Sequence, residues 1–250
     1  MRGSLRSWLA LVRSILVYHG NRERHRRMDA LYAQFVKPGD LAFDIGAHVG
    51  DRTASFRRLG ARVVAMEPQP GPAMILRVLF GRDRAVTLLR KAASGADGDL
   101  TLYTNSQNPT VSTLSGEFIK AAQGVRNWEG QSWDGAITVP VTTLDTLIVT
   151  YGEPAFIKID VEGHERDVLS GLTTPVPALC FEFTTIAREV AIACLDRLEE
   201  IGEYCYNVSL GESQTFVFPN DVTAQEMRFF IIEAPHIVNS GDVYARRLLD

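Results

Sequence analysis

The stretch LAFDIGAHVGDRTASFRRLGARVVAMEP, residues 41–68, decides the fold of this chain. An apolar run ends on Asp44 and breaks into two glycines, Gly46 and Gly50. A segment with helical periodicity follows, and a second apolar run then ends on Glu67. Strand, glycine turn, helix and strand predict a βαβ unit with a right-handed crossover. We expect both carboxylates at the carboxyl edge of a parallel sheet, which is where such sheets bind ligands.

The charges in this turn indicate which nucleotide-like ligand it suits. A dinucleotide site reads G-x-G-x-x-G and leaves a helix N-terminus free for a pyrophosphate, whereas here Asp44 replaces the first glycine. A carboxylate repels a diphosphate and attracts an ammonium or sulfonium group. Glu67 suits a ribose, because a carboxylate can accept hydrogen bonds from both hydroxyls of a diol. These features together favour S-adenosylmethionine, and the simpler alternative is any Rossmann-like unit with a capping aspartate.

The composition is that of an ordinary globular chain. Its 250 residues are 46% hydrophobic and 22% charged, enough for one α/β domain with a full core. A formal net charge of −4 argues against a general nucleic-acid binder. Cys180, Cys194 and Cys205 lie in or beside apolar runs without C-x-x-C spacing, which predicts reduced thiols in a cytoplasmic protein. No apolar stretch approaches the roughly 20 residues of a membrane span.

Residues 1–37 differ from the rest of the chain and predict an N-terminal helical extension ahead of a main domain at 38–250. Two amphipathic patterns flank the basic run at residues 22–27. They suit helices that pack on the main domain or on a second subunit, which would make a homo-oligomer. The alternative is peripheral membrane contact, or a basic wall for an acidic acceptor. A signal peptide is disfavoured because Arg13 interrupts the apolar segment.

After this unit the pattern continues as alternating helices and strands. The small residues Ala93 and Ser94 follow a strand expected at 86–89 and would leave room for a flat base such as adenine. The polar segment 104–136 carries Trp128 and Trp133. A loop of this length is usually functional or disordered, and its aromatic content favours a lid on the acceptor side.

A second informative stretch is AFIKIDVEGHE at residues 155–165. A buried strand ends on Asp160, and a helix begins near His164, so this segment brings ionisable groups to the edge that holds Asp44. Glu165 equally suits capping of the helix dipole. Lys158 needs an acidic partner, because a lone buried cation is costly. Glu182, inside a later strand, is either that partner or part of an acceptor pocket.

The end of the chain predicts how the sheet is completed. A helix is expected at 186–201, followed by strands at 204–210 and 215–218 around a glycine turn. This hairpin would supply the antiparallel last strand. An additional helix is expected in the tail from residue 224 onward.

Four segments carry a family resemblance that covers roughly residues 43–183: FDIGAHVGDRT, VVAMEPQP, VTTLDTL and IKIDVEGHERDVLSGL. They resemble the FkbM family of S-adenosylmethionine-dependent methyltransferases. The resemblance implies an α/β, Rossmann-like class I methyltransferase fold, with a seven-stranded, mostly parallel sheet and helices on both faces. It also implies O-methylation of a hydroxyl on a sugar, a secondary metabolite or another small molecule. The expected cofactor residues are Asp44, Gly46, Ala47, His48, Gly50, Thr53, Glu67, Pro68, Ala93, Ser94 and Asp160.

For the chemistry we expect in-line methyl transfer to an acceptor oxygen, assisted by a base that removes its proton. Asp160 and His164 are the candidate bases, and Glu162 completes the expected catalytic group. A divalent cation bridging Asp160 and Glu162 to a sugar diol is the rival means of activation, although the spacing alone predicts no metal ligands. The expected partner is a small-molecule or glycan acceptor, not nucleic acid. A non-catalytic nucleotide-fold binding protein and an NAD-linked oxidoreductase are the alternative functions.

Overall fold

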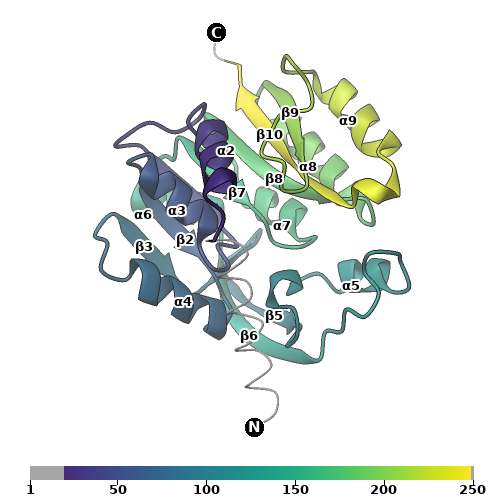
Figure 1. The fold of residues 1–250 in the computed structure, drawn as a ribbon, viewed down its shortest axis with the longest axis horizontal. Helices are drawn as coiled ribbons and strands as arrows, with labels where there is room; N and C mark the ends of the chain where they lie inside the picture. The colour runs from purple at the N-terminus through teal and green to yellow at the C-terminus, as the bar shows by residue number, and fades with distance from the viewer. Residues whose placement is uncertain (1–19, 249–250) are drawn as a thin grey trace.

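A seven-stranded sheet forms the centre of the molecule, in the order β3-β2-β1-β7-β8-β10-β9 (Figure 1). The computed structural model describes residues 20–248. All strands of this sheet run parallel except β10, which is antiparallel to both of its neighbours. The strands are β1 (Leu41–Ile45), β2 (Arg62–Met66), β3 (Val86–Leu89), β7 (Phe156–Ile159), β8 (Ala178–Thr184), β9 (Tyr204–Leu210) and β10 (Ser240–Arg247).

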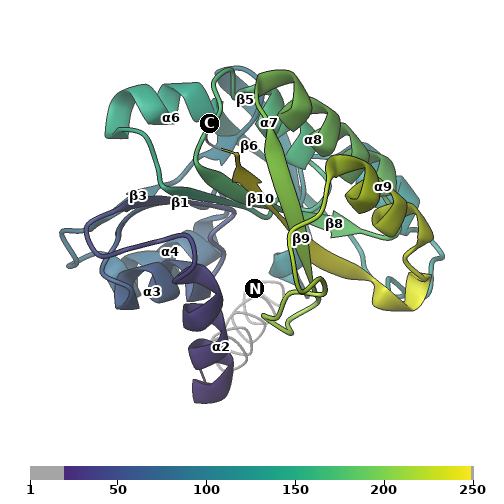
Figure 2. The ribbon, with the colours of Figure 1, turned by 90° about the horizontal axis from the view of Figure 1, so that it is seen from above.

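Helices cover both faces of this sheet (Figure 2). One face carries α2 (Arg22–Tyr32), α3 (Asp51–Arg58) and α4 (Pro70–Phe80), and the other carries α6 (Leu144–Tyr151), α7 (Glu165–Ser170), α8 (Arg188–Ile201) and α9 (Ala224–Glu233). Successive side chains of a strand point to opposite faces. In β1, Phe43 therefore joins the core under α6–α9, while Ala42 joins the core under α2–α4. The predicted fold class is confirmed.

The described part of the N-terminal extension belongs to the core of the main domain. Met28 and Tyr32 of α2 are fully buried, and the ring centroid of Tyr32 lies 4.8 Å from that of Phe56. Residues 1–19, which carry the first expected helix and its membrane or subunit contact, lie outside the described residues. Within residues 20–248, no helix is both long and apolar enough to span a membrane.

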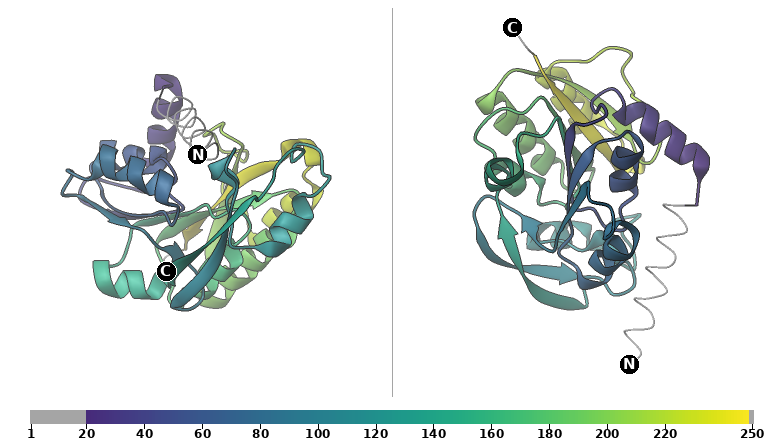
Figure 3. Two further views of the ribbon diagram at one scale, coloured as in Figure 1. Left: turned by 90° about the horizontal axis from the view of Figure 1, so that it is seen from below. Right: turned by 90° about the vertical axis from the view of Figure 1, so that its left-hand side faces the viewer.

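A second, three-stranded sheet lies beside the first, with α5 next to it (Figure 3). Its elements are β4 (Ala92–Ala93), β5 (Gly98–Thr104), β6 (Gly135–Thr142) and α5 (Gly116–Ala122). The segment between β5 and β6 has its own aromatic core, because Trp128 packs edge-on against Phe118 at 5.0 Å between centroids. Phe118 in turn packs on Gly163, where an added Cβ would come within 2.4 Å of its ring. This segment is therefore packed against the loop that follows β7.

The expected hairpin at 204–210 and 215–218 is wrong. The first strand exists as β9, but the second segment makes only an isolated bridge between Ser209 and Phe216. The antiparallel strand is β10, inserted between β8 and β9. An inner strand needs apolar side chains on both faces. Val243 and Tyr244 of β10 are at most 2% exposed, whereas Val217 is 43% exposed.

Candidate active site

The loop after β1 is held between the ends of two other strands. Gly46 has a positive φ of 84°, and a Cβ on it would lie 1.8 Å from the carbonyl oxygen of Asp160, so only glycine fits. The backbone N–H groups of Gly46 and Ala47 both donate to the carbonyl oxygen of Met66, at 3.0 and 2.8 Å. The loop thereby brings the carboxyl ends of β1, β2 and β7 together.

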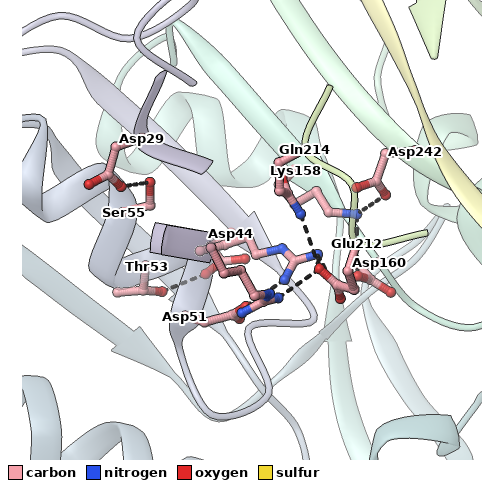
Figure 4. Close-up of polar contacts among 12 residues, drawn as sticks. Asp29, Asp44, Asp51, Thr53, Ser55, Lys158, Asp160, Glu212, Gln214 and Asp242 are labelled. Atoms are coloured by element: carbon pink, nitrogen blue, oxygen red, sulfur yellow. Dashed lines mark hydrogen bonds and ion pairs between the residues drawn. The ribbon is translucent and has the colours of Figure 1, made fainter. Parts of the chain in front are cut away.

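Asp44 lies under this loop and is only 2% exposed. Its Oδ2 accepts a hydrogen bond of 2.5 Å from the hydroxyl of Thr53 (Figure 4). Burial raises the pKa of Asp44 to about 6, although the Thr53 hydrogen bond opposes the shift. Thr53 is itself fully buried in α3. Its hydroxyl therefore orients Asp44 from behind the cleft.

Glu67, at the end of β2, is held by backbone donors on both oxygens. Its Oε2 accepts from the N–H of His48 at 2.9 Å, and its Oε1 accepts from the N–H of Gln69 at 2.8 Å. Burial raises its pKa to about 7, against the effect of these hydrogen bonds. Each oxygen keeps a lone pair for a further donor. The carboxylate is thus preorganised to accept hydrogen bonds from a ligand.

These groups open into one cleft of about 860 Å³, a volume that includes open solvent at its mouth. The predicted cofactor residues that line it are Asp44, Gly46, Ala47, His48, Glu67, Pro68, Ala93 and Asp160. Gly50, Thr53 and Ser94 are not part of this lining. Gly50 begins α3 behind the loop, where an added Cβ would meet Leu76 at 2.6 Å. The structure therefore separates residues that face the cleft from residues that shape it.

Lys158 forms the floor between β1 and β8 and is 1% exposed. Its Nζ lies 2.7 Å from Oδ1 of Asp242 and 3.3 Å from Oδ2 of Asp160 (Figure 4). Burial alone would lower its pKa, but these two carboxylates raise it well above the ordinary value. The expectation of an acidic partner is confirmed, but the partners are Asp160 and Asp242, not Glu182. Asp242 belongs to β10, a strand that was not predicted from the sequence.

Three carboxylates converge beside this lysine: Asp160, Glu162 and Glu182 each have an oxygen within 4.8 Å of the others. Asp160 and Glu162 line the cleft, and Glu182 reaches them from β8. Glu162 has a positive φ of 56°, which is uncommon for a residue with a side chain. Burial, followed by the charges of the neighbouring carboxylates, raises the pKa of both Glu162 and Glu182 well above the ordinary value.

His164 does not reach this cleft. Its Nε2 lies 3.1 Å from Oγ of Ser94, its Nδ1 lies 3.3 Å from the carboxylate of Asp167, and burial lowers its pKa. Both ring nitrogens are therefore engaged within the protein. Glu165 is also turned inward, since its Oε1 accepts from the N–H groups of Val161 and Gly163 at 3.0 and 3.2 Å. Glu165 lies in the first turn of α7, as the capping alternative expected, but its hydrogen bonds go to the loop that precedes the helix.

An ionic cluster at the rim of the cleft was not anticipated. Oδ2 of Asp51 accepts from Arg24 at 2.8 Å and from Arg52 at 2.5 Å, and Arg24 also binds Glu212 at 2.7 Å. Burial alone would raise the pKa of Asp51, but the two guanidinium groups hold it well below its usual range. Arg52 and Glu212 line the cleft. The basic run at residues 22–27 was the sequence feature that pointed to a charged surface here. The acidic partner of Arg24, Glu212, is 188 positions away in the chain.

The fold defines the class of this protein: a seven-stranded sheet with one antiparallel strand inserted beside its edge is that of Rossmann-like class I methyltransferases. Residues 44–208 match the family described as the methyltransferase FkbM domain. The chain therefore belongs to the FkbM family of methyltransferases.

The chain also resembles individual proteins in sequence or in fold. The chain is 30% identical over 162 residues to the hexuronic acid methyltransferase AglP of Haloferax volcanii, a match that covers 62% of this chain and 59% of the relative. The fold is similar to a TehB-like SAM-dependent methyltransferase from Corynebacterium glutamicum (TM-score 0.50, 9% identity, 98% and 99% of the two chains). A precorrin-6y C5,15-methyltransferase from Geobacter metallireducens also aligns (TM-score 0.46, 13% identity, 88% and 86%). At these identities the structural likeness concerns the fold alone.

Proposed function

We propose that the protein is an S-adenosylmethionine-dependent O-methyltransferase that acts on a hydroxyl of a sugar or another small molecule. One observation carries the proposal. Asp44 and Glu67, both buried, end neighbouring strands and line the same cleft. A cleft with two carboxylates is unfavourable for the pyrophosphate of a dinucleotide and favourable for a cationic ribose compound.

The residues of the cleft fit this cofactor. Glu67 would hold the ribose hydroxyls with the lone pairs that its backbone contacts leave available. Asp44 would face the positively charged part of the molecule. Ala92 and Ala93, together with Leu102, give the cleft a small apolar wall suited to a flat base. When bound, S-adenosylmethionine supplies a methyl group on a positively charged sulfur, which leaves as a neutral thioether after the methyl–sulfur bond breaks.

On the acceptor side we assign Asp160 and Glu162, which line the cleft at the end of β7. Either carboxylate can accept a hydrogen bond from an acceptor hydroxyl and take its proton as the oxygen–methyl bond forms. Burial and the neighbouring carboxylates raise the pKa of Glu162, which favours its protonated form, and Glu162 can act as this base only when it is ionised. We assign His164 a positioning role, through its contact with Ser94, because its ring nitrogens face the protein.

Two observations support a proposal for the acceptor class: the name of the Haloferax volcanii relative and a cationic residue in the cleft. The name of the Haloferax volcanii relative identifies hexuronic acid as its substrate. In this chain Lys91 lines the cleft, so a cationic group is available for an acidic sugar. We therefore propose uronic acid glycosides as the first acceptors to test.

Isothermal titration calorimetry with S-adenosylmethionine, S-adenosylhomocysteine and NAD tests the cofactor. We expect both adenosyl compounds to bind and NAD not to bind. Glu67→Gln should weaken binding of S-adenosylmethionine by about 1.5–3 kcal/mol, the scale of a hydrogen bond to a charged group. The matched control is Glu153→Gln, an exposed acid ahead of β7 at the opposite edge of the sheet, and it should bind as wild type does.

The outcomes separate the alternatives. NAD binding in place of S-adenosylmethionine would indicate an oxidoreductase. Cofactor binding without release of S-adenosylhomocysteine on a panel of uronic acid, neutral glycoside and alcohol acceptors would favour a non-catalytic binding protein. Unchanged affinity in folded Glu67→Gln would refute the assignment of Glu67 to the ribose.

A further inference from the structure

We propose that Asp160, Glu162 and Glu182 bind one divalent cation of the magnesium or manganese type at the acceptor end of the cleft. The binding site is argued from this chain's own carboxylates. Its role in catalysis, which is to hold the acceptor, rests on the proposed function.

The distances suit such an ion. One oxygen from each of the three carboxylates lies within 4.8 Å of the other two. Oxygens bound to Mg²⁺ at about 2.0–2.1 Å lie about 3 Å apart when adjacent and about 4.2 Å apart when opposite each other. Small rotations of the carboxylates would therefore bring them into an octahedral first shell, and water or acceptor oxygens would fill the remaining positions.

The charges in the cluster lack sufficient compensation from the protein. Lys158 is the neighbouring cation, and it is already bound to Asp242 at 2.7 Å as well as to Asp160 at 3.3 Å. The positive charge of Lys158 is therefore shared between Asp160 and Asp242. It does not balance three ionised carboxylates, which would repel one another. A divalent cation would neutralise them and attract them to one point.

The hydrogen bonding of the cluster points independently to a ligand. Glu162 is only 8% exposed, and among residues 20–248 its carboxylate has no hydrogen-bond or ion-pair partner, although it is directed at the other two acids. The buried Oε2 of Glu182 also has no partner in the described part of the chain. Buried polar atoms are almost always satisfied, and each exception requires an explanation. A bound cation would give both carboxylates a partner.

Hydrogen bonds hold the loop that carries Glu162 in a fixed conformation. The hydroxyl of Thr113 donates to the carbonyl oxygen of Glu162 at 2.7 Å, and Glu165 binds the N–H groups on both sides of Glu162, at Val161 and Gly163. These contacts keep Glu162 in its left-handed conformation with φ of 56°. The side chain is therefore aimed by the backbone, as expected for a metal ligand and not for a freely rotating surface acid.

The position of the ion relative to the cofactor residues suggests what it would hold. In the sheet order β2-β1-β7-β8, Glu67 ends β2, whereas Asp160 and Glu162 lie in the loop directly after β7 and Glu182 lies on β8. The ion would thus lie across Asp44 from the ribose site, on the acceptor side. Two neighbouring sugar oxygens, either a pair of hydroxyls or a hydroxyl and a uronic carboxylate, are ligands that such an ion accepts.

Electron paramagnetic resonance titration with Mn²⁺ tests the site on the full chain. We expect one Mn²⁺ per chain in the wild type, and at least tenfold weaker binding in Glu162→Gln and in Glu182→Gln. Glu153→Gln, an exposed acid outside the cleft, should bind as the wild type does. Circular dichroism of each variant checks that the fold is retained, and the two independent glutamine variants keep the test valid if one fails to fold.

Absence of stoichiometric Mn²⁺ binding by the wild type, or equal binding by all folded variants, would overturn the proposal and indicate that the acids share protons instead. Binding of S-adenosylhomocysteine is measured on the same samples. Cofactor binding without Mn²⁺ binding would reject the cation site alone, while Mn²⁺ binding without cofactor binding would reject the proposed function alone.

Discussion

Replacing Lys158 with methionine would test how strongly the buried charges at the floor of the cleft depend on one another. The change keeps a long unbranched side chain and removes only the charge. Lys158 and Asp242 have side chains that are 1% and 8% exposed, so the variant would leave Asp242 charged in an apolar environment. Breaking a buried ion pair by removing one partner costs about 3–5 kcal/mol. Asp160 is 32% exposed and adds little, because solvent screens it. We therefore expect about 3 kcal/mol, the lower end of that range.

Urea unfolding followed by far-UV circular dichroism at pH 7.5 measures this effect. A loss of about 3 kcal/mol should lower the midpoint by at least about 1 M urea, given slopes of about 1–3 kcal/mol per M for domains of modest size. In the double variant Lys158→Met/Asp242→Asn the second change removes the isolated charge, so part of the stability should return. The surface control is Arg228→Gln, since Arg228 is paired with the exposed acids Asp196 and Glu199 and should contribute less than about 1 kcal/mol. A loss below about 1 kcal/mol for Lys158→Met, or a double variant no more stable than the single one, would refute this account.

Three further predictions concern the cofactor side of the cleft. Gly46→Ala should abolish binding of S-adenosylmethionine in calorimetry, because the new Cβ would meet the backbone of Asp160 and the residue has a positive φ; normal affinity would contradict the role given to this loop. Affinity should rise from pH 5 to pH 8 as Asp44 and Glu67 ionise, with pKa values of about 6 and about 7, and Asp44→Asn should flatten the lower part of this profile. The sign reverses for stability: burial raises the pKa of Glu67 above its ordinary 4.5, so the free energy of unfolding without cofactor should fall as the pH rises from about 4.5 to 7. Urea unfolding of Glu67→Gln should lack this component, and an identical pH profile in that variant would contradict it.

The elements with local signals could be predicted from the sequence. The glycine turn after β1, the helix α3 that follows it and the strand β3 are encoded in periodicity and in the positions of glycine. These signals lie within short segments of the sequence, and the structure has all three elements where they were expected. The carboxylates that end β1, β2 and β7 were predicted to share one edge for the same reason, since parallel strands in successive βα units point the same way.

Side-chain pairing across the fold could not be predicted in this way. The ionic cluster joins Arg24 to Glu212 over 188 positions, and no local pattern relates two segments so far apart. His164 has the right place in the sequence for a base, at the start of a helix near Asp160, but its ring nitrogens contact Ser94 and Asp167 and not the cleft.

The sequence by itself determined that this chain forms a parallel α/β sheet with acidic strand ends, because hydrophobic period and residue spacing set the local backbone. Only the tertiary structure decided which strand completes the sheet and which acids meet. β10 occupies an inner position because Val243 and Tyr244 bury both of its faces, and its insertion brings Asp242 to Lys158. With Lys158 bound there, Asp160, Glu162 and Glu182 are left facing one another. Electrostatic partners depend on distances in space, and those distances exist only after the whole sheet has assembled.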